Sequence, residues 1–338
     1  MQMDLRQLRA LVAVADHESF SAAARSLHTV QSNVSTHIAR LERELGVTLV
    51  DRATGKLTPE GTVVVARARR IDGELSAIDA EIGSLVGEVA GTVRVGVIGT
   101  TARWLVPDLL HALDDRYPRI RLILVDATTS SLLPQVASGR LDSAVVNLPV
   151  SDPDIDSEVL FDEDPIVVAP LDHPLAELDV ISLAQLAEHP LLLGPPGTSF
   201  RDAVDAEAAA AGIALSTHAE VDGMRLLASL AFQGFGAALL PSSAAPGWVT
   251  GSWKRVRIDG LSCRAVGLAT SRRTSPPAPA RAVRETLRAV VHASAPQQPG
   301  LRLVTSGSDA PSMRAAAPTR PSASPRTSTT AAPPPRHV

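Results

Sequence analysis

The feature that most constrains the fold is a run of apolar residues spaced alternately four and three apart. The positions are Val64, Ala68, Ile71, Leu75, Ile78, Ile82, Leu85 and Val89. This is the a/d spacing of a helix that packs along another helix. A long helix over residues 62–90 therefore separates an N-terminal head from a larger body. We expect it to pair with the same helix of a second copy through Ile71, Leu75, Ile78, Ile82 and Leu85. Packing within its own domain is the alternative.

Three shorter helices precede this one, so residues 1–61 form a helical head. Apolar residues recur at helical spacing over 4–16, and a second helix ends near residue 27. A third helix is predicted from about Gln31 to Leu45, before Gly46, a common C-terminal cap. Two short arms around Thr54-Gly55 then predict a hairpin or wing.

The third helix has an outward face suited to DNA. On a helical wheel, Val34, Ile38, Leu41 and Leu45 share the side predicted to face the core. The opposite side carries hydrogen-bonding side chains, of which Gln and Asn can bond adenine edges, and Ser, Thr and Arg can bond bases or phosphates. These candidate contacts are Gln31, Ser32, Asn33, Ser35, Thr36 and Arg40. A polar face without function is the alternative.

Charge is distributed unevenly along the chain, whose net charge is -4. Residues 1–70 hold 10 basic and 7 acidic residues, whereas residues 71–294 hold 17 basic and 28 acidic residues. A cationic head on an anionic body is typical of a head that faces a polyanion.

Beyond Gly91 strands and helices alternate. Strands are predicted at 93–97, 120–125, 141–147, 158–169, 191–193, 217–221, 236–240, 254–258 and 264–270, and helices near 103–116, 131–138, 182–188, 199–211, 222–233 and 279–293. This alternation favours an α/β fold with mostly parallel sheets, in one large sheet or two small lobes. Residues 295–338 are rich in Pro, Ala, Ser, Thr and Arg, which predicts a disordered tail.

Several classes of protein are disfavoured. The single cysteine, Cys263, excludes a disulfide within the chain and a thiolate-cluster zinc site, and we predict no metal and no cofactor. The N-terminus is unlike a signal peptide, and no uncharged apolar run approaches the ~18 residues of a membrane helix. Neither HExxH nor GxSxG occurs. We expect a soluble, cytoplasmic protein that does not contact a membrane and is not an enzyme.

The loop over residues 194–201 fails as a Walker A motif, because Ser199, Phe200 and Arg201 stand where Gly, Lys and Ser/Thr are needed. It remains a loop that enters a helix, as do two earlier strand-to-helix junctions. Ligands of α/β sheets bind beyond the carboxyl ends of strands. We therefore expect a small polar or carboxylate effector at Thr100, Thr101, Thr128, Thr129, Ser130, Thr198, Ser199 and Arg201. Routine helix capping is the alternative.

Several stretches carry a family resemblance in both residue type and spacing. In the head they include Ser19-Phe20-Ser21-Ala22-Ala23-Ala24, Gln31-Ser32-Asn33-Val34-Ser35 and Leu57-Thr58-Pro59-Glu60-Gly61; in the body they include Gly139-Arg140-Leu141-Asp142 and Gly234-Phe235-Gly236. The chain resembles the LysR-type transcriptional regulators, whose head is a winged helix-turn-helix. It departs from them at Val30, where a Ser or Thr usually caps the recognition helix, at Val50 in place of a common Phe, and in a short wing.

The resemblance implies roles for these residues. The six candidates on the third helix would contact bases and phosphates, and Arg52 and Lys56 would be wing contacts to the DNA backbone. Residues 91–294 would form an effector domain of two lobes like those of periplasmic binding proteins. Lobe I would comprise about 91–163 and 264–294, and lobe II about 164–263.

We therefore expect a sequence-specific transcriptional regulator whose DNA binding or activation is modulated by an effector between the lobes. Its expected partners are double-stranded DNA, the effector, further copies in a homodimer or homotetramer, and RNA polymerase if it activates. One alternative is a stand-alone small-molecule-binding protein whose head serves dimerisation only. Another is an α/β enzyme with a regulatory head, which no constellation of residues supports.

Overall fold

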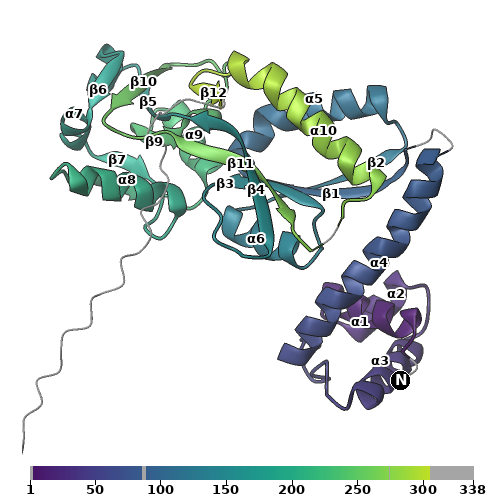
Figure 1. Ribbon diagram of the computed structural model, residues 1–338. Helices are drawn as coiled ribbons and strands as arrows, with labels where there is room; N and C mark the ends of the chain where they lie inside the picture. Colours follow the sequence, from purple (N-terminus) through teal and green to yellow (C-terminus); the bar gives the residue numbers. More distant parts are fainter. Residues whose placement is uncertain (1–2, 86–88, 274, 305–338) are drawn as a thin grey trace, which may run out of the picture.

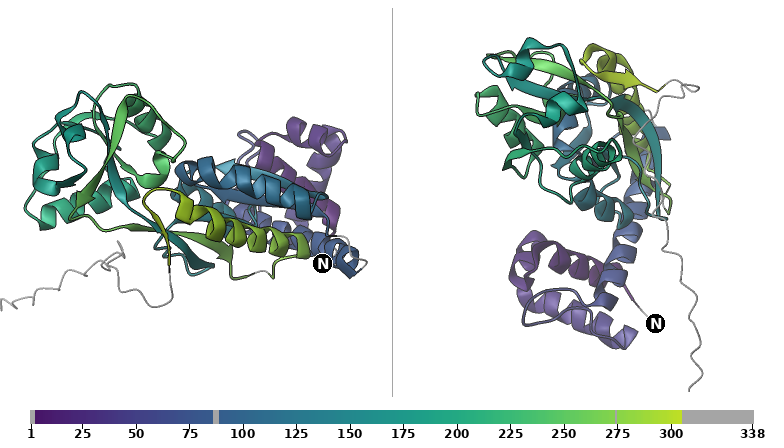
Figure 2. Two further views of the ribbon diagram at one scale, coloured as in Figure 1. Left: turned by 90° about the horizontal axis from the view of Figure 1, so that it is seen from above. Right: turned by 90° about the vertical axis from the view of Figure 1, so that its left-hand side faces the viewer.

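The computed structural model describes residues 3–85, 89–273 and 275–304, which form three parts (Figure 1). A small helical head is joined by one long helix to a body of two lobes. The left view of Figure 2 shows the two lobes side by side, and its right view shows the head below them at the other end of the long helix. The predicted fold class is thereby confirmed: a helical head with a wing, a linker helix and a two-lobed α/β body.

Three helices build the head: α1 (Leu5–His17), α2 (Phe20–Ser26) and α3 (Gln31–Leu45). Asp4 and Gln7 form a reciprocal capping box at the start of α1, and the Ser19 hydroxyl caps α2. The face of α3 predicted to be apolar packs into the head core, where Ile38 and Leu41 are fully buried. The opposite face of α3 is thereby left outward.

The wing is a short antiparallel contact between Val50 and Leu57. Glu42 of α3 fastens it by accepting hydrogen bonds from the backbone N–H groups of Leu49 at 2.8 Å and Val50 at 3.3 Å. Gly55 has φ +72°, and a Cβ there would overlap the carbonyl oxygen of Glu18. A glycine is therefore needed where the wing turn packs against the head.

The linker helix α4 (Pro59–Leu85) begins inside the segment predicted to be head. Its first turns pack on α1, and Ala68 of the apolar seam is 2% exposed. Farther along, Ile71, Ile78 and Ile82 are 41%, 58% and 61% exposed. Leu75 is half-buried, and the side chain of Leu85 lies outside the described part of the chain. The seam therefore packs against the head at its start, at Ala68, and faces solvent farther along, at Ile78 and Ile82.

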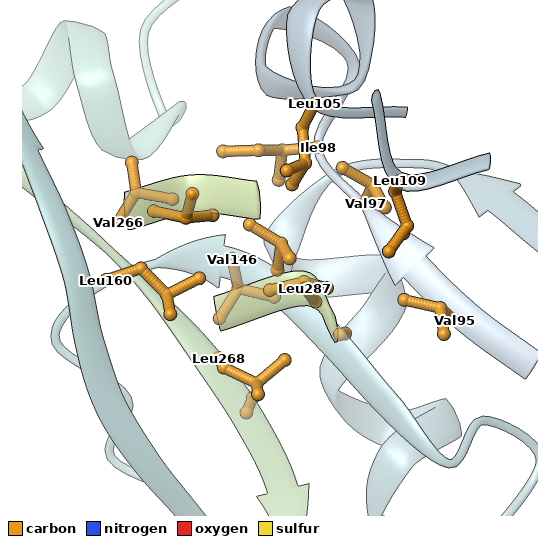
Figure 3. Packing of buried hydrophobic residues seen from close by; sticks show 14 of the residues in the cluster. Val95, Val97, Ile98, Leu105, Leu109, Val146, Leu160, Val266, Leu268 and Leu287 are labelled. Carbon is orange, nitrogen blue, oxygen red and sulfur yellow. The ribbon is translucent and has the colours of Figure 1, made fainter. Parts of the chain in front are cut away.

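Lobe I contains a six-stranded sheet in the order β12-β4-β11-β3-β1-β2. Its strands are β1 (Gly91–Val97), β2 (Ile120–Asp126), β3 (Ser143–Asn147), β4 (Ile155–Glu163), β11 (Arg264–Ser271) and β12 (Leu301–Leu303). Helices α5 (Gly99–Arg116) and α10 (Ala278–Ser294) lie side by side over one face, and α6 (Thr129–Ala137) covers the other (Figure 1). Figure 3 shows part of this core, where Leu105 of α5 and Leu287 of α10 pack with Val95 and Val146 of the sheet.

Lobe II contains a second six-stranded sheet, in the order β6-β10-β5-β9-β7-β8. Its strands are β5 (Pro165–Pro170), β6 (Val180–Ser182), β7 (Leu191–Leu193), β8 (Thr217–Glu220), β9 (Ala238–Pro241) and β10 (Trp253–Asp259), and its helices are α7 (Leu183–Ala187), α8 (Ser199–Ala210) and α9 (Met224–Phe232). Alternate residues of β5 point to opposite faces: Val167 packs with α7 and α8, and Val168 packs with α9. Both faces of the sheet are therefore covered by helices.

The prediction of mostly parallel sheets is wrong, because among the described residues five strand pairs are parallel and five are antiparallel. The reason is that the chain passes between the lobes twice. β5 enters lobe II at the first crossing and β11 re-enters lobe I at the second, each antiparallel to both neighbours. The apolar run predicted as one strand near 158–169 is therefore two strands, β4 and β5, in different lobes.

The prediction of a disordered tail from residue 295 is wrong for its first ten residues. Residues 295–304 contain a 3-10 turn (Ala295–Gln297) and β12, which pairs with β4. Leu301 is 5% exposed in the core of lobe I, so apolar burial holds this segment against the sheet. Residues 305–338 lie outside the described residues.

Candidate DNA-binding helix and effector cavity

The first turns of α3 present polar side chains to solvent. The exposed ones are Gln31, Ser32, Asn33, Thr36 and Arg40, and Ser35 is half-buried. Two hydrogen bonds within the head hold side chains of this region. The Ser21 hydroxyl donates to Oε1 of Gln31 at 2.7 Å, and the Thr36 hydroxyl donates to the Ser32 carbonyl at 2.8 Å. The six predicted contacts thus share one face, partly oriented before any DNA binds.

The N-terminus of α3 is open to an acceptor. Its N-cap residue is Val30, which has no polar side-chain atom, and the helix begins at Gln31. Thr29, one residue earlier, does not cap the helix either, because its hydroxyl accepts a hydrogen bond from the side-chain amide of Asn33 at 3.0 Å. The Asn33 N–H donates to the Val30 carbonyl at 3.1 Å, so the backbone N–H groups that the first turn offers to a phosphate are those of Gln31 and Ser32.

Arg52 is engaged within the head. Its guanidinium donates to the Ser35 hydroxyl at 2.9 Å and to Glu42 at 3.0 Å, and it lies over the Phe20 ring. Lys56, by contrast, is exposed on the wing. Arg52 therefore joins the wing to α3 in the DNA-free head, and its contact with the DNA backbone stays a prediction.

A cavity of about 650 Å³ lies between the lobes, where four helices begin. Lobe I contributes the N-termini of α5 and α6, and lobe II those of α8 and α9. The N-cap residues of α5 and α9 are Ile98 and Gly223, which carry no polar side chain. Those of α6 and α8 are Thr128 and Thr198, whose hydroxyls bond to Ser131 and to the Pro195 carbonyl instead. All four helices therefore turn N–H groups without side-chain caps toward the cavity.

Six of the eight predicted effector residues line this cavity: Thr100, Thr128, Thr129, Ser130, Thr198 and Ser199. Two do not, which corrects the prediction. Thr101 is fully buried in lobe I. Arg201 is 9% exposed and holds the preceding loop, since it donates to Asp205 at 2.7 Å and to the Gly194 carbonyl at 2.8 Å.

Five polar residues of the cavity were not predicted from the sequence: Asp126, Asn147, Asp222, Arg225 and Arg264. Asp126 ends a strand, and Asp222 and Arg225 follow one, so the rule that identified the threonines also applies to them. Arg264 starts a strand, and its place becomes clear only when the second crossing between lobes is known. Asn147 ends β3, and its Oδ1 is buried with no hydrogen-bond partner among the described residues.

Arg264 and Glu163 form a buried ion pair beside the cavity. Glu163 is fully buried, and its Oε1 accepts a hydrogen bond from Nε of Arg264 at 2.5 Å. Its second oxygen accepts from the Ser243 N–H at 3.0 Å. Arg264 also donates to Thr100 at 3.3 Å and lies over the Phe200 ring of lobe II. These contacts neutralise Arg264 and tie together the segments at the lobe crossings.

Cys263, the sole cysteine of the sequence, is 6% exposed. Burial raises the pKa of its thiol, and the neighbouring Asp162 adds to this effect. A raised pKa disfavours the thiolate, which is the reactive form toward oxidants.

Across the described residues, the structure has no helix both long and apolar enough to cross a membrane.

Comparison with known proteins identifies the domains that carry these two regions. A family model of the LysR substrate binding domain matches residues 87–292, and a model of the bacterial regulatory helix-turn-helix protein, lysR family, matches residues 5–62. The two models together span the head and nearly all of the two lobes.

The relatives include proteins of known regulatory type. The chain is 39% identical over 248 residues to a probable hydrogen peroxide-inducible genes activator of Streptomyces viridosporus, covering 72% of this chain and 79% of that protein. It is 34% identical over 248 residues to the DNA-binding transcriptional dual regulator OxyR of Escherichia coli, covering 72% and 81%. A solved full-length OxyR variant from Pseudomonas aeruginosa has a TM-score of 0.71 and 27% identity, covering 86% of this chain and 95% of that one.

These relatives are transcriptional regulators and not enzymes. The matched regions contain the exposed polar face of α3 and the interlobe cavity lined by four helix N-termini. The chain therefore belongs to the LysR family, as a DNA-binding transcriptional regulator that is modulated by an effector bound in its substrate-binding domain.

Proposed function

We propose that this regulator responds to a small carboxylate bound between its lobes. The observation that carries the proposal is the convergence of four helix N-termini on one cavity. Each contributes N–H donors and the positive end of a helix dipole, which favour an anion. The hydroxyls of Ser130 and Ser199 add donors from the two lobes. A carboxylate that contacts both lobes favours one lobe spacing and shifts the equilibrium of the molecule toward it.

A disulfide switch is unsuited to this chain. Relatives named hydrogen peroxide-inducible genes activators make peroxide an effector to consider. This sequence has one cysteine, so no two of its own residues can form a disulfide. Cys263 is also buried with a raised pKa, which slows oxidation of its thiol. We therefore favour reversible binding in the cavity over thiol oxidation.

We further propose that α3 reads the operator in the major groove. Gln31 and Asn33 would bond base edges, and Ser32, Ser35, Thr36 and Arg40 would contact bases or phosphates. Lys56 would contact the DNA backbone from the wing. Arg52 would hold the side chains of Ser35 and Glu42 in position through the hydrogen bonds that it donates to them. The proposed setting is the cytoplasm, with RNA polymerase as a further partner where the protein activates transcription.

The decisive experiment measures fluorescence anisotropy of the full chain on DNA from immediately upstream of its own gene, with random DNA as competitor. Small carboxylates form one arm of an effector screen, and hydrogen peroxide forms the other. We expect operator binding to resist competitor, to fall with salt, and to change with a carboxylate. A peroxide response lost in Cys263→Ala would overturn the carboxylate proposal. Equal affinity for random DNA and for every fragment in a genome-wide selection would favour a head that serves dimerisation only.

A further inference from the structure

Two charged side chains meet across the effector cavity. Asp126 is the last residue of β2 in lobe I, and Arg225 is the second residue of α9 in lobe II. Nη1 of Arg225 lies 2.6 Å from Oδ2 of Asp126, and both residues line the cavity. The ion pair therefore joins the two lobes within the site proposed for the effector.

The pair also occupies the N-terminus of α5. A Cβ on Gly99, the first residue of that helix, would lie 2.9 Å from Oδ1 of Asp126 and 3.3 Å from Nε of Arg225. The Asp126 carboxylate thus sits against backbone that carries the positive end of the helix dipole. Asp126 thus occupies, at the N-terminus of α5, a position that would also suit the carboxylate of a ligand.

The two arginines of the cavity differ in how firmly they are held. Arg264 is 7% exposed and paired with the fully buried Glu163, so removing its partner would leave a buried charge. The side chains of Arg225 and Asp126 are 58% and 36% exposed, so water screens their attraction. A second carboxylate can therefore replace Asp126 on Arg225 without stranding a buried charge. Of the two arginines, Arg225 is the one that a ligand can engage.

We propose that Arg225 binds the anionic group of the effector and that Asp126 is its resident competitor, latching the lobes together until the effector displaces it. This inference rests on the proposed function, because it assigns residues to that effector site. The exchange leaves Arg225 paired with a carboxylate and turns the half-exposed Asp126 back to solvent, and it removes the hold of lobe I on Arg225. The spacing of the lobes is then set by the effector in place of the ion pair.

The first test needs no ligand. Spin labels at His111→Cys in lobe I and Ala210→Cys in lobe II, both exposed, report the interlobe distance by pulsed electron resonance in a Cys263→Ala background. Labelled chains are diluted with unlabelled ones so that distances within one chain dominate. We expect Asp126→Asn and Arg225→Gln each to broaden and lengthen the distance distribution. The double variant should match the single ones, because the two residues act as a unit.

Arg288→Gln is the matched control, since Arg288 forms an exposed ion pair with Glu158 within lobe I, and it should leave the distribution unchanged. Melting temperatures close to that of the control establish that the variants are folded. A distribution of wild-type width in either single variant would overturn the latch. This result is separate from failure of the proposed function, which would appear as operator binding that no carboxylate changes.

The second test uses acetate as the probe and follows its binding to the full chain by NMR titration. Asp126→Asn should bind acetate about twofold to fivefold more tightly, because the competing carboxylate is gone, and Arg225→Gln should bind it more weakly by a similar factor. Weaker binding in Asp126→Asn would make Asp126 a partner of the ligand and overturn the competition. Equal binding in all variants, or none in any of them, would overturn the assignment of Arg225.

Discussion

At the scale of single residues, Gln31 and Lys56 should affect DNA binding in different ways. Gln31 is the first residue of α3 and is exposed, whereas Lys56 is exposed on the wing. Gln31→Ala should lower operator affinity by about 1–3 kcal/mol and barely change binding to random DNA, because a base contact is lost. Lys56→Ala should weaken both and reduce the salt slope by about one unit, because a phosphate contact is lost. Anisotropy titrations at several salt concentrations measure both effects, and identical behaviour of the two variants would contradict the assignment.

Glu163 offers a residue-scale prediction about stability. Glu163→Gln leaves Arg264 as a buried charge whose ion-pair partner has become neutral. The free energy of unfolding should fall by about 3–5 kcal/mol, which denaturant titration of the full chain measures. Glu158→Gln removes an exposed carboxylate that pairs with Arg288, and it should lower the free energy by less than about 1 kcal/mol. Equal losses would mean that burial of Glu163 does not govern its contribution.

At the scale of elements, we expect α4 to be the surface through which two copies of the chain associate. Ile78 and Ile82 are among its most exposed apolar residues, and each would gain about 1.5–3 kcal/mol on full burial against a second copy. Replacing both with Asp should weaken self-association by at least about a hundredfold. Sedimentation velocity measures this, with Glu74→Ala as an exposed control off the seam. An unchanged sedimentation profile would place the principal interface elsewhere.

The helices and strands also show which features can be predicted from sequence patterns and which cannot. Heptad spacing and the wheel of α3 depend on local periodicity, so the burial of Ile38 and Leu41 was predictable. The threonines at strand ends were predictable because parallel strands present their carboxyl ends to one edge. Arg264 was not, since its place depends on a crossing between lobes with no local signal. Arg201 was misplaced because its spacing fits both an anion site and the structural bond to Gly194 that it makes.

At the scale of the whole molecule, the head touches lobe I directly. Asp16, near the end of α1, accepts a hydrogen bond from Arg69 of α4 at 2.5 Å and pairs with Arg140 of lobe I at 3.2 Å. Arg140 lies just before β3, and Asn147 at the far end of β3 lines the effector cavity. One short strand therefore connects the head contact to the effector site.

Coupling between two binding sites is reciprocal, so operator DNA should change the lobes if the effector changes DNA binding. We predict that operator DNA shifts the interlobe distance and that Arg140→Ala, which removes the contact with Asp16, reduces this shift by roughly half or more. The spin-labelled full chain measures it with and without DNA, and Arg288→Ala serves as a control on the same lobe. Because Asp16 keeps its bond to Arg69, the head itself should stay folded. A shift of wild-type size in Arg140→Ala would mean that α4 alone carries the coupling.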